Sequence, residues 1–239
     1  MKNKSNNIAE SEFKLSIIIP VYNEDVTVHT VIEKILKIKF NKEIIVVNDG
    51  STDGTTDILK QYDKSEIKIV CHRKNLGKGA AIRTGFINAT GDILLIQDAD
   101  LEYNPDDYPA LLEPIISGKA DVVYGSRFSR HGAHAVHSFW HYTGNRILTH
   151  LSNIFSNIYL TDMETCYKVF NKKAIEGIEL CQNRFGFEPE ITAKIAKKRL
   201  RIFEVPITYQ GRSYAEGKKI KWKDGFNAVW CIIKYNLFS

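Results

Sequence analysis

The strongest constraint on the fold of this chain is a regular alternation between short apolar runs and helical patterns. The apolar runs, rich in Ile, Val and Leu, lie at 14–23, 42–49, 67–72, 92–98 and 120–126. Apolar residues at the spacing of a helix occur between them, at 24–38, 52–62, 77–89 and 105–116. Strands that are apolar along their whole length are typical of a parallel sheet covered by helices on both faces. We therefore predict an α/β fold with a mostly parallel sheet.

Polar side chains follow each predicted strand at the point where the strand ends. In parallel sheets of this kind, ligands bind beyond the carboxyl ends of the strands. The polar residues at these ends are Tyr22, Asn23, Glu24, Asn48, Asp49, His72, Arg73, Asp98, Asp100, Ser126 and Arg127. We predict that they gather along one edge of the sheet and that the binding site lies there.

The sequence LLIQDADLEY, residues 94–103, carries the most specific signal at this edge. Asp98 and Asp100 are two residues apart, so in an extended segment both carboxylates leave the same face of the chain. Mg²⁺ and Mn²⁺ prefer oxygen ligands, and substrate phosphates usually complete their coordination. The alternative is that these acids only cap the following helix. Because they end the fourth strand, where a nucleotide would lie, a metal site is favoured.

Three other motifs carry weaker signals. The segment NLGKGAAIRTG at 75–85 matches neither a P-loop nor a dinucleotide fingerprint, but Lys78 and the glycine amides offer positive charge to a nucleotide. No cysteine or acid at a suitable spacing accompanies His134, His137 and His141, so zinc is disfavoured. The basic segments 196–201 and 218–223 lack the context of a nucleic-acid-binding motif, and no nucleic acid partner is expected.

Composition and length define the expected organisation. Polar residues 1–12 are predicted to be disordered, residues 13–225 to form the catalytic domain and residues 226–239 an interfacial tail. The formal charge of +5 fits an anionic substrate or a membrane surface. Four separated cysteines and the lack of an apolar signal segment predict a cytoplasmic protein with reduced thiols. No apolar run reaches the roughly 18–20 residues that span a bilayer, so membrane contact is expected to be peripheral.

Two later stretches combine apolar, aromatic and basic residues. In the first stretch, residues 139–160, apolar residues recur at nearly helical spacing. They are Trp140, Ile147, Leu148, Leu151, Ile154, Phe155 and Ile158. The C-terminal stretch carries Phe226, Trp230, Ile233, Leu237 and Phe238, with lysines nearby. Such a mixture is typical of helices that lie in the membrane interface. The alternative is that both stretches pack on the catalytic domain or form a dimer contact.

Several segments resemble the family 2 glycosyltransferases, which have the GT-A fold. They are SIIIPVYNE, VVNDGSTDGT, NLGKGAAIRTGF, GDILLIQDADLEYNP and VVYGSRF. The later segments TDMETCYKVF, FGFEPEI and EVPITYQGRSYAEGKKIKWKDG resemble the branch of dolichol-phosphate mannose synthase and the polyprenyl-phosphate glycosyltransferases. The resemblance covers about residues 14–225.

This resemblance implies a role for each matching residue. The positions implied for the nucleobase and ribose are Pro20, Tyr22, Glu24 and Asp49, and Lys78 and Ala99 also belong to the implied donor site. The implied metal ligands are Asp98, Asp100 and Glu102, where the family often has Gln at the last position. The implied phosphate contacts are Arg127, Arg212 and Lys218, although Gly217 replaces a Ser of the family pattern. The predicted catalytic residues are Asp98, Asp100, Arg127 and Arg212.

The implied reaction is an inverting, metal-dependent transfer of a hexose to a polyprenyl phosphate on the cytoplasmic face of a membrane. The donor is a nucleoside-diphosphate sugar, GDP-mannose or UDP-glucose, with mannose favoured. A hydroxyl acceptor would need a general base, whereas a phosphate acceptor would not. Asp162 or Glu164 is the candidate for such a base. Two alternatives remain: a soluble family 2 enzyme with a hydroxyl acceptor, and a nucleotidyltransferase or non-catalytic nucleotide-sugar binder.

Overall fold

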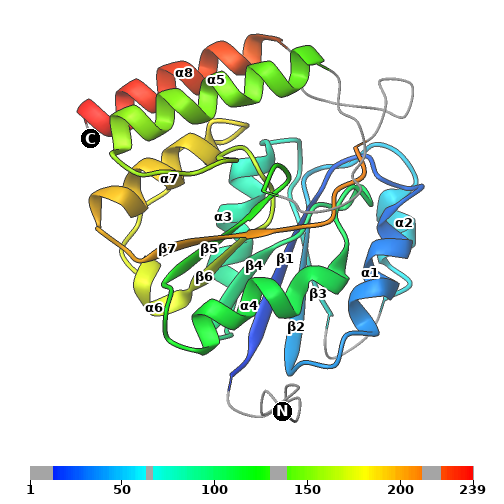
Figure 1. The fold of residues 1–239 in the computed structure, drawn as a ribbon. Coiled ribbons are helices and arrows are strands. Elements are labelled where there is room, and N and C mark those ends of the chain that lie inside the picture. The colour runs from blue at the N-terminus through cyan, green and yellow to red at the C-terminus, as the bar shows by residue number, and fades with distance from the viewer. Residues whose placement is uncertain (1–12, 63–66, 130–138, 212–221, 239) are drawn as a thin grey trace.

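A seven-stranded β-sheet forms the centre of the protein (Figure 1). The computed structural model describes residues 13–62, 67–129, 139–211 and 222–238. Across the sheet the strands follow the order β3 (Ile67–Cys71), β2 (Lys42–Asn48), β1 (Leu15–Val21), β4 (Ile93–Ile96), β6 (Lys168–Asn171), β5 (Val122–Ser126) and β7 (Ile202–Pro206). Every pair is parallel except the two made by β6. The predicted mostly parallel sheet is confirmed.

No apolar run in the sequence indicates strand β6. It has four residues, and polar Lys168 and Asn171 occupy its two ends. It lies between β4 and β5 and runs antiparallel to both, with Phe170 opposite Leu94 on one side and Val122 on the other. Because two antiparallel pairings restore the original direction, β5 points the same way as β4, and their carboxyl ends share one edge of the sheet.

Helices cover both faces of this sheet. They are α1 (Val28–Leu36), α2 (Thr55–Leu59), α3 (Lys78–Asn88), α4 (Tyr108–Ile116) and α6 (Lys172–Ile175). The helix predicted at 105–116 begins as a 3₁₀ turn, Pro105–Asp107, before α4. Phe86 of α3 contacts Phe170 at 5.7 Å between ring centroids, whereas Tyr108 of α4 contacts Tyr167 at 5.8 Å. Residues three apart in an extended segment face opposite ways, so α3 and α4 cover opposite faces.

A second group of helices follows the sheet domain. It consists of α5 (Phe139–Ser156), α7 (Phe187–Lys197) and α8 (Trp222–Leu237). Figure 1 shows α5 and α8 side by side along the top of the molecule, and both contact α7. The predicted helical appendage is therefore present, and the predicted boundary after residue 225 falls within α8. Within the described residues, no helix is both long and apolar enough to cross a membrane.

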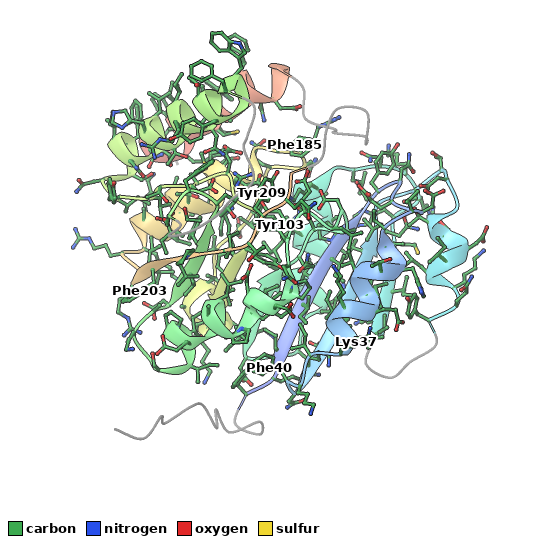
Figure 2. All side chains as sticks on the ribbon, turned by 45° about the vertical axis from the view of Figure 1, so that its right-hand side comes forward. Lys37, Phe40, Tyr103, Phe185, Phe203 and Tyr209 are labelled. Atoms are coloured by element: carbon green, nitrogen blue, oxygen red, sulfur yellow. The ribbon has the colours of Figure 1, made fainter. Side chains whose placement is uncertain are left out.

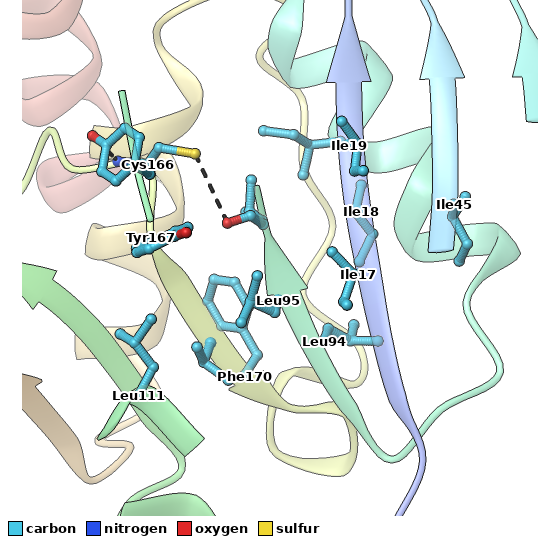
Figure 3. Packing of buried hydrophobic residues seen from close by; sticks show 14 of the residues in the cluster. Ile17, Ile18, Ile19, Ile45, Leu94, Leu95, Leu111, Cys166, Tyr167 and Phe170 are labelled. Atoms are coloured by element: carbon cyan, nitrogen blue, oxygen red, sulfur yellow. Dashed lines mark hydrogen bonds between the residues drawn. The ribbon is translucent and has the colours of Figure 1, made fainter. Parts of the chain in front are cut away.

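One continuous apolar core holds the sheet and its helices together. Figure 3 shows Ile17–Ile19 of β1 beside Leu94 and Leu95 of β4, all almost fully buried. The core extends through Phe170 to Tyr167, and the Cys166 thiol donates to the Ile96 carbonyl oxygen at 3.8 Å. Since rigid strands carry the residues at the sheet edge, the polar groups there are held in fixed positions.

Candidate active site

The carboxyl ends of β1 and β4 meet where the strand order changes direction. From β1 the chain proceeds outward through β2 and β3, then returns to place β4 on the other side of β1. Such a switch point leaves a crevice between the loops that follow the two central strands. The segment Tyr22–Glu24 follows β1, and Asp98–Asp100 follows β4. The predicted gathering of these polar residues at one edge of the sheet is therefore observed.

The acidic segment after β4 turns sharply around Leu101. Leu101 has φ 62°, in the left-handed region, and the Glu102 amide donates to Asp100 Oδ1 at 3.2 Å. Tyr209 donates its hydroxyl to Glu102 Oε2 at 2.9 Å. Figure 2 shows Tyr209 next to Tyr103, and their ring centroids are 5.2 Å apart. The turn and the tyrosine contact fix the carboxylates after β4 in place.

Lys78 at the start of α3 neutralises the first of these carboxylates. Its ammonium lies 2.9 Å from Asp98 Oδ1 and 3.1 Å from Oδ2, and 3.6 Å from Glu188 Oε1. Burial alone would raise the pKa of Asp98, but the charge and hydrogen bond of Lys78 outweigh burial and hold that pKa below its usual value. Asp98 is therefore an anion at neutral pH, balanced by a cation that touches two acids.

The carboxylates after β4 fit a divalent cation whose remaining ligands come from a bound substrate. Asp98 and Asp100 supply hard oxygen atoms, the ligands that Mg²⁺ and Mn²⁺ prefer. Among the described residues, however, no three or more His, Cys, Asp or Glu side chains are grouped so that they could hold a metal. A cation here would need further oxygen atoms, such as those of a diphosphate. Of the three histidines weighed for zinc, His134 and His137 lie outside the described residues.

Asp49, predicted at the nucleoside, holds the loop that precedes α3. Its Oδ2 accepts from the Gly77 amide at 2.7 Å, and its Oδ1 accepts from the Leu76 amide at 2.9 Å. His72 Nδ1 lies 2.6 Å from the same Oδ1. Gly77 has φ 105°, and a Cβ there would come within 2.4 Å of the Asn183 carbonyl oxygen. Asp49 thus shapes the glycine turn beside Lys78, and a direct contact with the donor stays a prediction.

The other predicted donor residues lie along the same edge. Pro20 is within β1, and Ala99 is buried between the two aspartates. Glu24 is half-buried and accepts from the Thr27 hydroxyl at 2.9 Å, and Tyr22 precedes it in the same loop. Arg212 and Lys218 lie outside the described residues, so their predicted phosphate contacts have no structural counterpart here.

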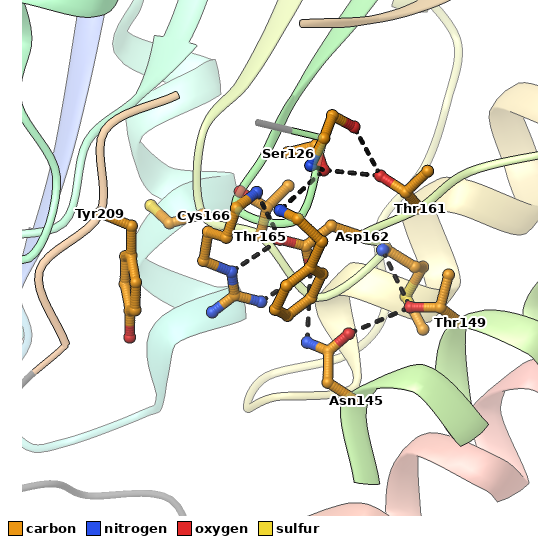
Figure 4. A network of polar contacts seen from close by, with 12 residues as sticks. Ser126, Asn145, Thr149, Thr161, Asp162, Thr165, Cys166 and Tyr209 are labelled. Carbon is orange, nitrogen blue, oxygen red and sulfur yellow. Dashed lines mark hydrogen bonds and ion pairs between the residues drawn. The ribbon is translucent and has the colours of Figure 1, made fainter. Parts of the chain in front are cut away.

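Arg127 after β5 forms a buried pair with Asp162. Arg127 Nε and Nη2 donate to the two Asp162 carboxylate oxygens, each at 2.7 Å, and the Arg127 amide donates to Asp162 Oδ2 at 3.1 Å. Figure 4 shows Asp162 within this network of polar contacts. The guanidinium carbon lies 5.1 Å from the ring centroid of Tyr209 and 5.5 Å from that of Phe128. Paired and enclosed by aromatic rings, the guanidinium is held at the edge of the sheet with one orientation.

Beneath this edge lies a cluster of ionisable residues that the apolar pattern does not reveal. Lys168 of β6 is fully buried and donates to the Thr165 carbonyl oxygen, and Glu188 in the first turn of α7 is also buried. Burial lowers the pKa of Lys168. Burial, reinforced by the Glu188 carboxyl, raises the pKa of Glu164 to about 8. Among the described residues, Glu164 Oε1 and Glu188 Oε2 have no hydrogen-bond partner.

The raised pKa of Glu164 predicts a stability that falls with pH. A carboxyl with pKa 4.5 when unfolded and about 8 when folded keeps its proton in the native state, so unfolding releases it. The free energy of unfolding then falls by roughly 1.4 kcal/mol per pH unit within this window. Over the 3.5 pH units of this window the loss is about 5 kcal/mol, so we expect Glu164→Gln to remove it and to melt at least about 10 °C above the wild type at pH 8.5.

Differential scanning fluorimetry between pH 5.5 and 8.5 measures this effect. Glu176→Gln, which changes an exposed carboxyl, is the control and should track the wild type across the range. If Glu164→Gln and the wild type lose stability in parallel as the pH rises, Glu164 is ionised in the folded protein and the assignment is wrong.

Comparison with known proteins identifies the family. Residues 16–178 match the family model described as glycosyl transferase family 2. The chain belongs to this family. A relative named undecaprenyl-phosphate 4-deoxy-4-formamido-L-arabinose transferase, from Aeromonas hydrophila, is 27% identical over 211 residues, covering 85% of this chain and 62% of the relative. The dolichol-phosphate mannosyltransferase of Pyrococcus furiosus is 30% identical over 214 residues, covering 86% of this chain and 59% of the relative.

The family 2 chain therefore spans about three fifths of the length of these two relatives. Among solved structures, it is similar to glucosyl-3-phosphoglycerate synthase from Mycobacterium tuberculosis in complex with Mn²⁺, UDP and glucosyl-3-phosphoglycerate. The TM-score is 0.69 at 16% identity, covering 95% of this chain and 81% of that chain. This likeness concerns the fold, and it confirms the expected GT-A architecture.

Proposed function

We propose that this chain transfers a hexose, with mannose favoured and glucose the alternative, from a nucleoside-diphosphate sugar to a polyprenyl phosphate. Family membership supports sugar transfer, and both curated relatives are named for a polyprenyl-phosphate substrate. The observation that carries the proposal is that the Asp98 and Asp100 carboxylates, after β4, lie at the same edge of the sheet as the Arg127 guanidinium, after β5. Acidic and basic groups together suit a diphosphate that binds with a divalent cation.

The described residues have distinct proposed tasks in this reaction. Asp98 and Asp100 would hold Mg²⁺ or Mn²⁺ together with diphosphate oxygens, and the bound cation would neutralise charge that develops on the leaving diphosphate. Glu102 stays the predicted third ligand, although among the described residues its carboxylate is not grouped with the other two as a metal site. Lys78 and Arg127 offer fixed positive charge to the same phosphates, with Arg212 and Lys218 proposed to join them. The nucleoside is assigned to the loop after β1, with Pro20, Tyr22 and Glu24, next to Asp49.

The state of the two candidate bases favours a phosphate acceptor over a hydroxyl. Asp162 is fully buried and engaged by Arg127 at both oxygens, so it is poorly placed to take a proton. Glu164, with its pKa raised to about 8, holds a proton at neutral pH. A hydroxyl nucleophile needs a base that is deprotonated, so that the base can accept the hydroxyl proton. A phosphate monoester is largely ionised at pH 7 and attacks without one.

We propose in addition that α5 and α8 rest on the cytoplasmic face of a membrane without spanning it. Trp140, Ile147 and Ile154 on α5 are exposed, as are Phe226 and Trp230 on α8. Spacings of seven and four residues place each set along one side of its helix. The exposed Arg146 and the half-buried Lys234 lie on the same two helices. Apolar rings beside cations suit a layer of anionic lipid headgroups.

Replacing both exposed tryptophans tests this surface. Trp140 is 79% exposed and Trp230 56%, so changing both to Ser should leave the melting temperature unchanged. We expect the double variant to lose most of its sedimentation with phosphatidylglycerol vesicles at low salt. Its turnover should fall more with a long-chain polyprenyl phosphate than with a short soluble analogue. Ile87→Ser, an equally exposed apolar residue at 79% on α3, is the matched control and should bind vesicles normally.

The reaction itself is tested with a panel of labelled nucleotide sugars. GDP-mannose, UDP-glucose and GDP-glucose are each offered with undecaprenyl phosphate, dolichyl phosphate or a soluble sugar alcohol, and labelled product is extracted into organic solvent. We expect a lipid-linked hexose from one donor. Labelled product only on the hydroxyl acceptor would select the alternative transferase. Release of pyrophosphate from a nucleoside triphosphate and a sugar phosphate would identify a nucleotidyltransferase. Binding of a nucleotide sugar without turnover would identify a non-catalytic binding protein.

A further inference from the structure

Helix α5 buries several polar side chains and exposes several apolar ones, unlike an ordinary surface helix. Asn145, Thr149 and Ser152 are buried, whereas Trp140 and Ile154 on the same helix are exposed. A water-facing helix normally buries its apolar stripe and exposes its polar face. The buried polar groups therefore have a purpose other than apolar packing, and their partners show what it is.

The inner face of α5 binds the segment 160–163 through side chains one turn apart. Asn145 Nδ2 donates to Asp162 Oδ1 at 3.3 Å. The Thr149 hydroxyl donates to Asn145 Oδ1 and accepts from the Met163 amide, both at 3.2 Å. Asn153 accepts from the Leu160 amide at 3.0 Å and donates to the Leu160 carbonyl oxygen at 2.8 Å. Three consecutive turns of α5 thus fix the backbone and side chains of this segment.

The same segment holds Arg127 on its other side. The Asp162 oxygen that accepts from Asn145 also accepts from Arg127 Nη2, so one carboxylate atom joins the helix to the guanidinium. Glu204 of β7 accepts from the Thr161 and Asp162 amides at 2.9 and 3.1 Å, which anchors the backbone behind the carboxylate. Figure 4 shows this path from Thr149 through Asn145 to Asp162. Buried hydrogen-bond networks of this kind specify one geometry.

We propose that Asn145 is a positioning residue that fixes Asp162 and, through it, the direction of Arg127, so that a lipid surface bound to the outer face of α5 also steadies Arg127. The second half of this inference rests on the proposed function, because it requires that α5 lie on lipid. The first half does not, since the contacts among α5, Asp162 and Arg127 exist within the chain itself.

The positioning role is measured on the free protein by NMR, as the rate at which the Arg127 Nε–H proton exchanges with water. The signal is assigned by its disappearance in Arg127→Lys. We expect Asn145→Ala to speed this exchange about tenfold, because a hydrogen bond to a charged carboxylate is lost. Thr149→Val, which keeps the side-chain shape but removes the hydroxyl that orients Asn145, should give a smaller increase and serves if Asn145→Ala fails to fold.

Ser152→Ala is the matched control for these variants. Ser152 is as buried as Thr149 on the same helix, and its hydroxyl has no hydrogen-bond partner among the described residues. Its substitution should leave the Arg127 exchange rate within about twofold of the wild type. Unchanged exchange in both Asn145→Ala and Thr149→Val would overturn the proposal. Equal acceleration in Ser152→Ala would also overturn it, since general loosening of α5 would then suffice.

The lipid half is measured with isotropic bicelles that contain phosphatidylglycerol. In the wild type, bicelle binding should slow the Arg127 Nε–H exchange, and in Asn145→Ala it should not. If bicelles bind but the wild-type rate does not change, coupling between the surface and Arg127 is refuted. If bicelles do not bind, the membrane part of the proposed function fails together with this coupling, whereas the positioning role of Asn145 is judged by the lipid-free measurement alone.

Discussion

Asp98→Asn and Asp100→Asn are each expected to remove nearly all sugar transfer while the protein stays folded. Each change replaces a charged carboxylate by a neutral amide, so the proposed divalent cation and its diphosphate would lose their anchor after β4. Loss of one group that stabilises developing charge typically lowers turnover by about 10²–10³-fold. Transfer of labelled hexose to polyprenyl phosphate measures the effect. The melting temperature should change little for Asp100→Asn, because its side chain is half-buried at a strand end. Asp98→Asn also breaks the ion pair with Lys78 and should lower the melting temperature without unfolding the protein, since Glu188 remains 3.6 Å from the ammonium.

The matched control is Asp106→Asn, an exposed carboxylate in the 3₁₀ turn that follows. It should keep wild-type activity. Excess EDTA should abolish transfer by the wild type, and added Mg²⁺ or Mn²⁺ should restore it. Full activity in chelator would remove the metal role from Asp98 and Asp100 together. Activity lost through unfolding would instead appear as a melting temperature at or below the assay temperature in the Asn variants.

The edge of the sheet could be predicted from the sequence because strands and their ends are local features. The run that leads into Asp98 is apolar, short and bounded, so both the strand and the position of the acids follow from residues 92–100 alone. Parallel pairing then brings Tyr22 and Asp98 to one edge without any knowledge of side-chain contacts. Local pattern and sheet geometry together suffice for this part of the fold.

Pairings between distant residues could not be predicted in the same way. Arg127 and Asp162 are 35 positions apart, and Asp162 lies in the loop before β6, a strand of four residues that contains a buried lysine. No periodicity marks such a strand. The contact of Asp49 with the loop before α3 could not be predicted either, because its carboxylate accepts hydrogen bonds from amides 27 and 28 residues further along the chain.

The two amphipathic stretches show a different limit. Helical spacing identifies an apolar side of residues 139–160, but spacing does not say which side of the helix meets the protein. In the structure Leu148 and Leu151 pack against the core, whereas Trp140, Ile147 and Ile154 are exposed. The packing alternative therefore holds for the inward side of α5, and the interfacial alternative stays a prediction for its exposed apolar side.

Arg127→Ala is expected to cost both stability and activity. Removing the guanidinium leaves the Asp162 carboxylate, which is fully buried, without its counter-ion. Breaking a buried pair in this way typically lowers the free energy of unfolding by about 3–5 kcal/mol, which corresponds to roughly 10 °C in melting temperature. Turnover should fall by about 10²–10³-fold because positive charge at the leaving phosphates is lost. Arg127→Lys should restore only part of the activity, since a lysine cannot pair bidentately.

The chain contains a geometrically matched control for this variant. Arg201 binds Asp121 through the same three donors, with its amide, Nε and Nη2 at 2.9, 3.0 and 2.7 Å, but its side chain is 57% exposed against 9% for Arg127. Arg201→Ala should therefore cost less than about 1 kcal/mol. The double change Arg127→Ala with Asp162→Asn removes the stranded charge, so at least half of the lost stability should return without any return of transfer. If the double variant regains activity, Arg127 serves only to neutralise Asp162 and has no place at the phosphates.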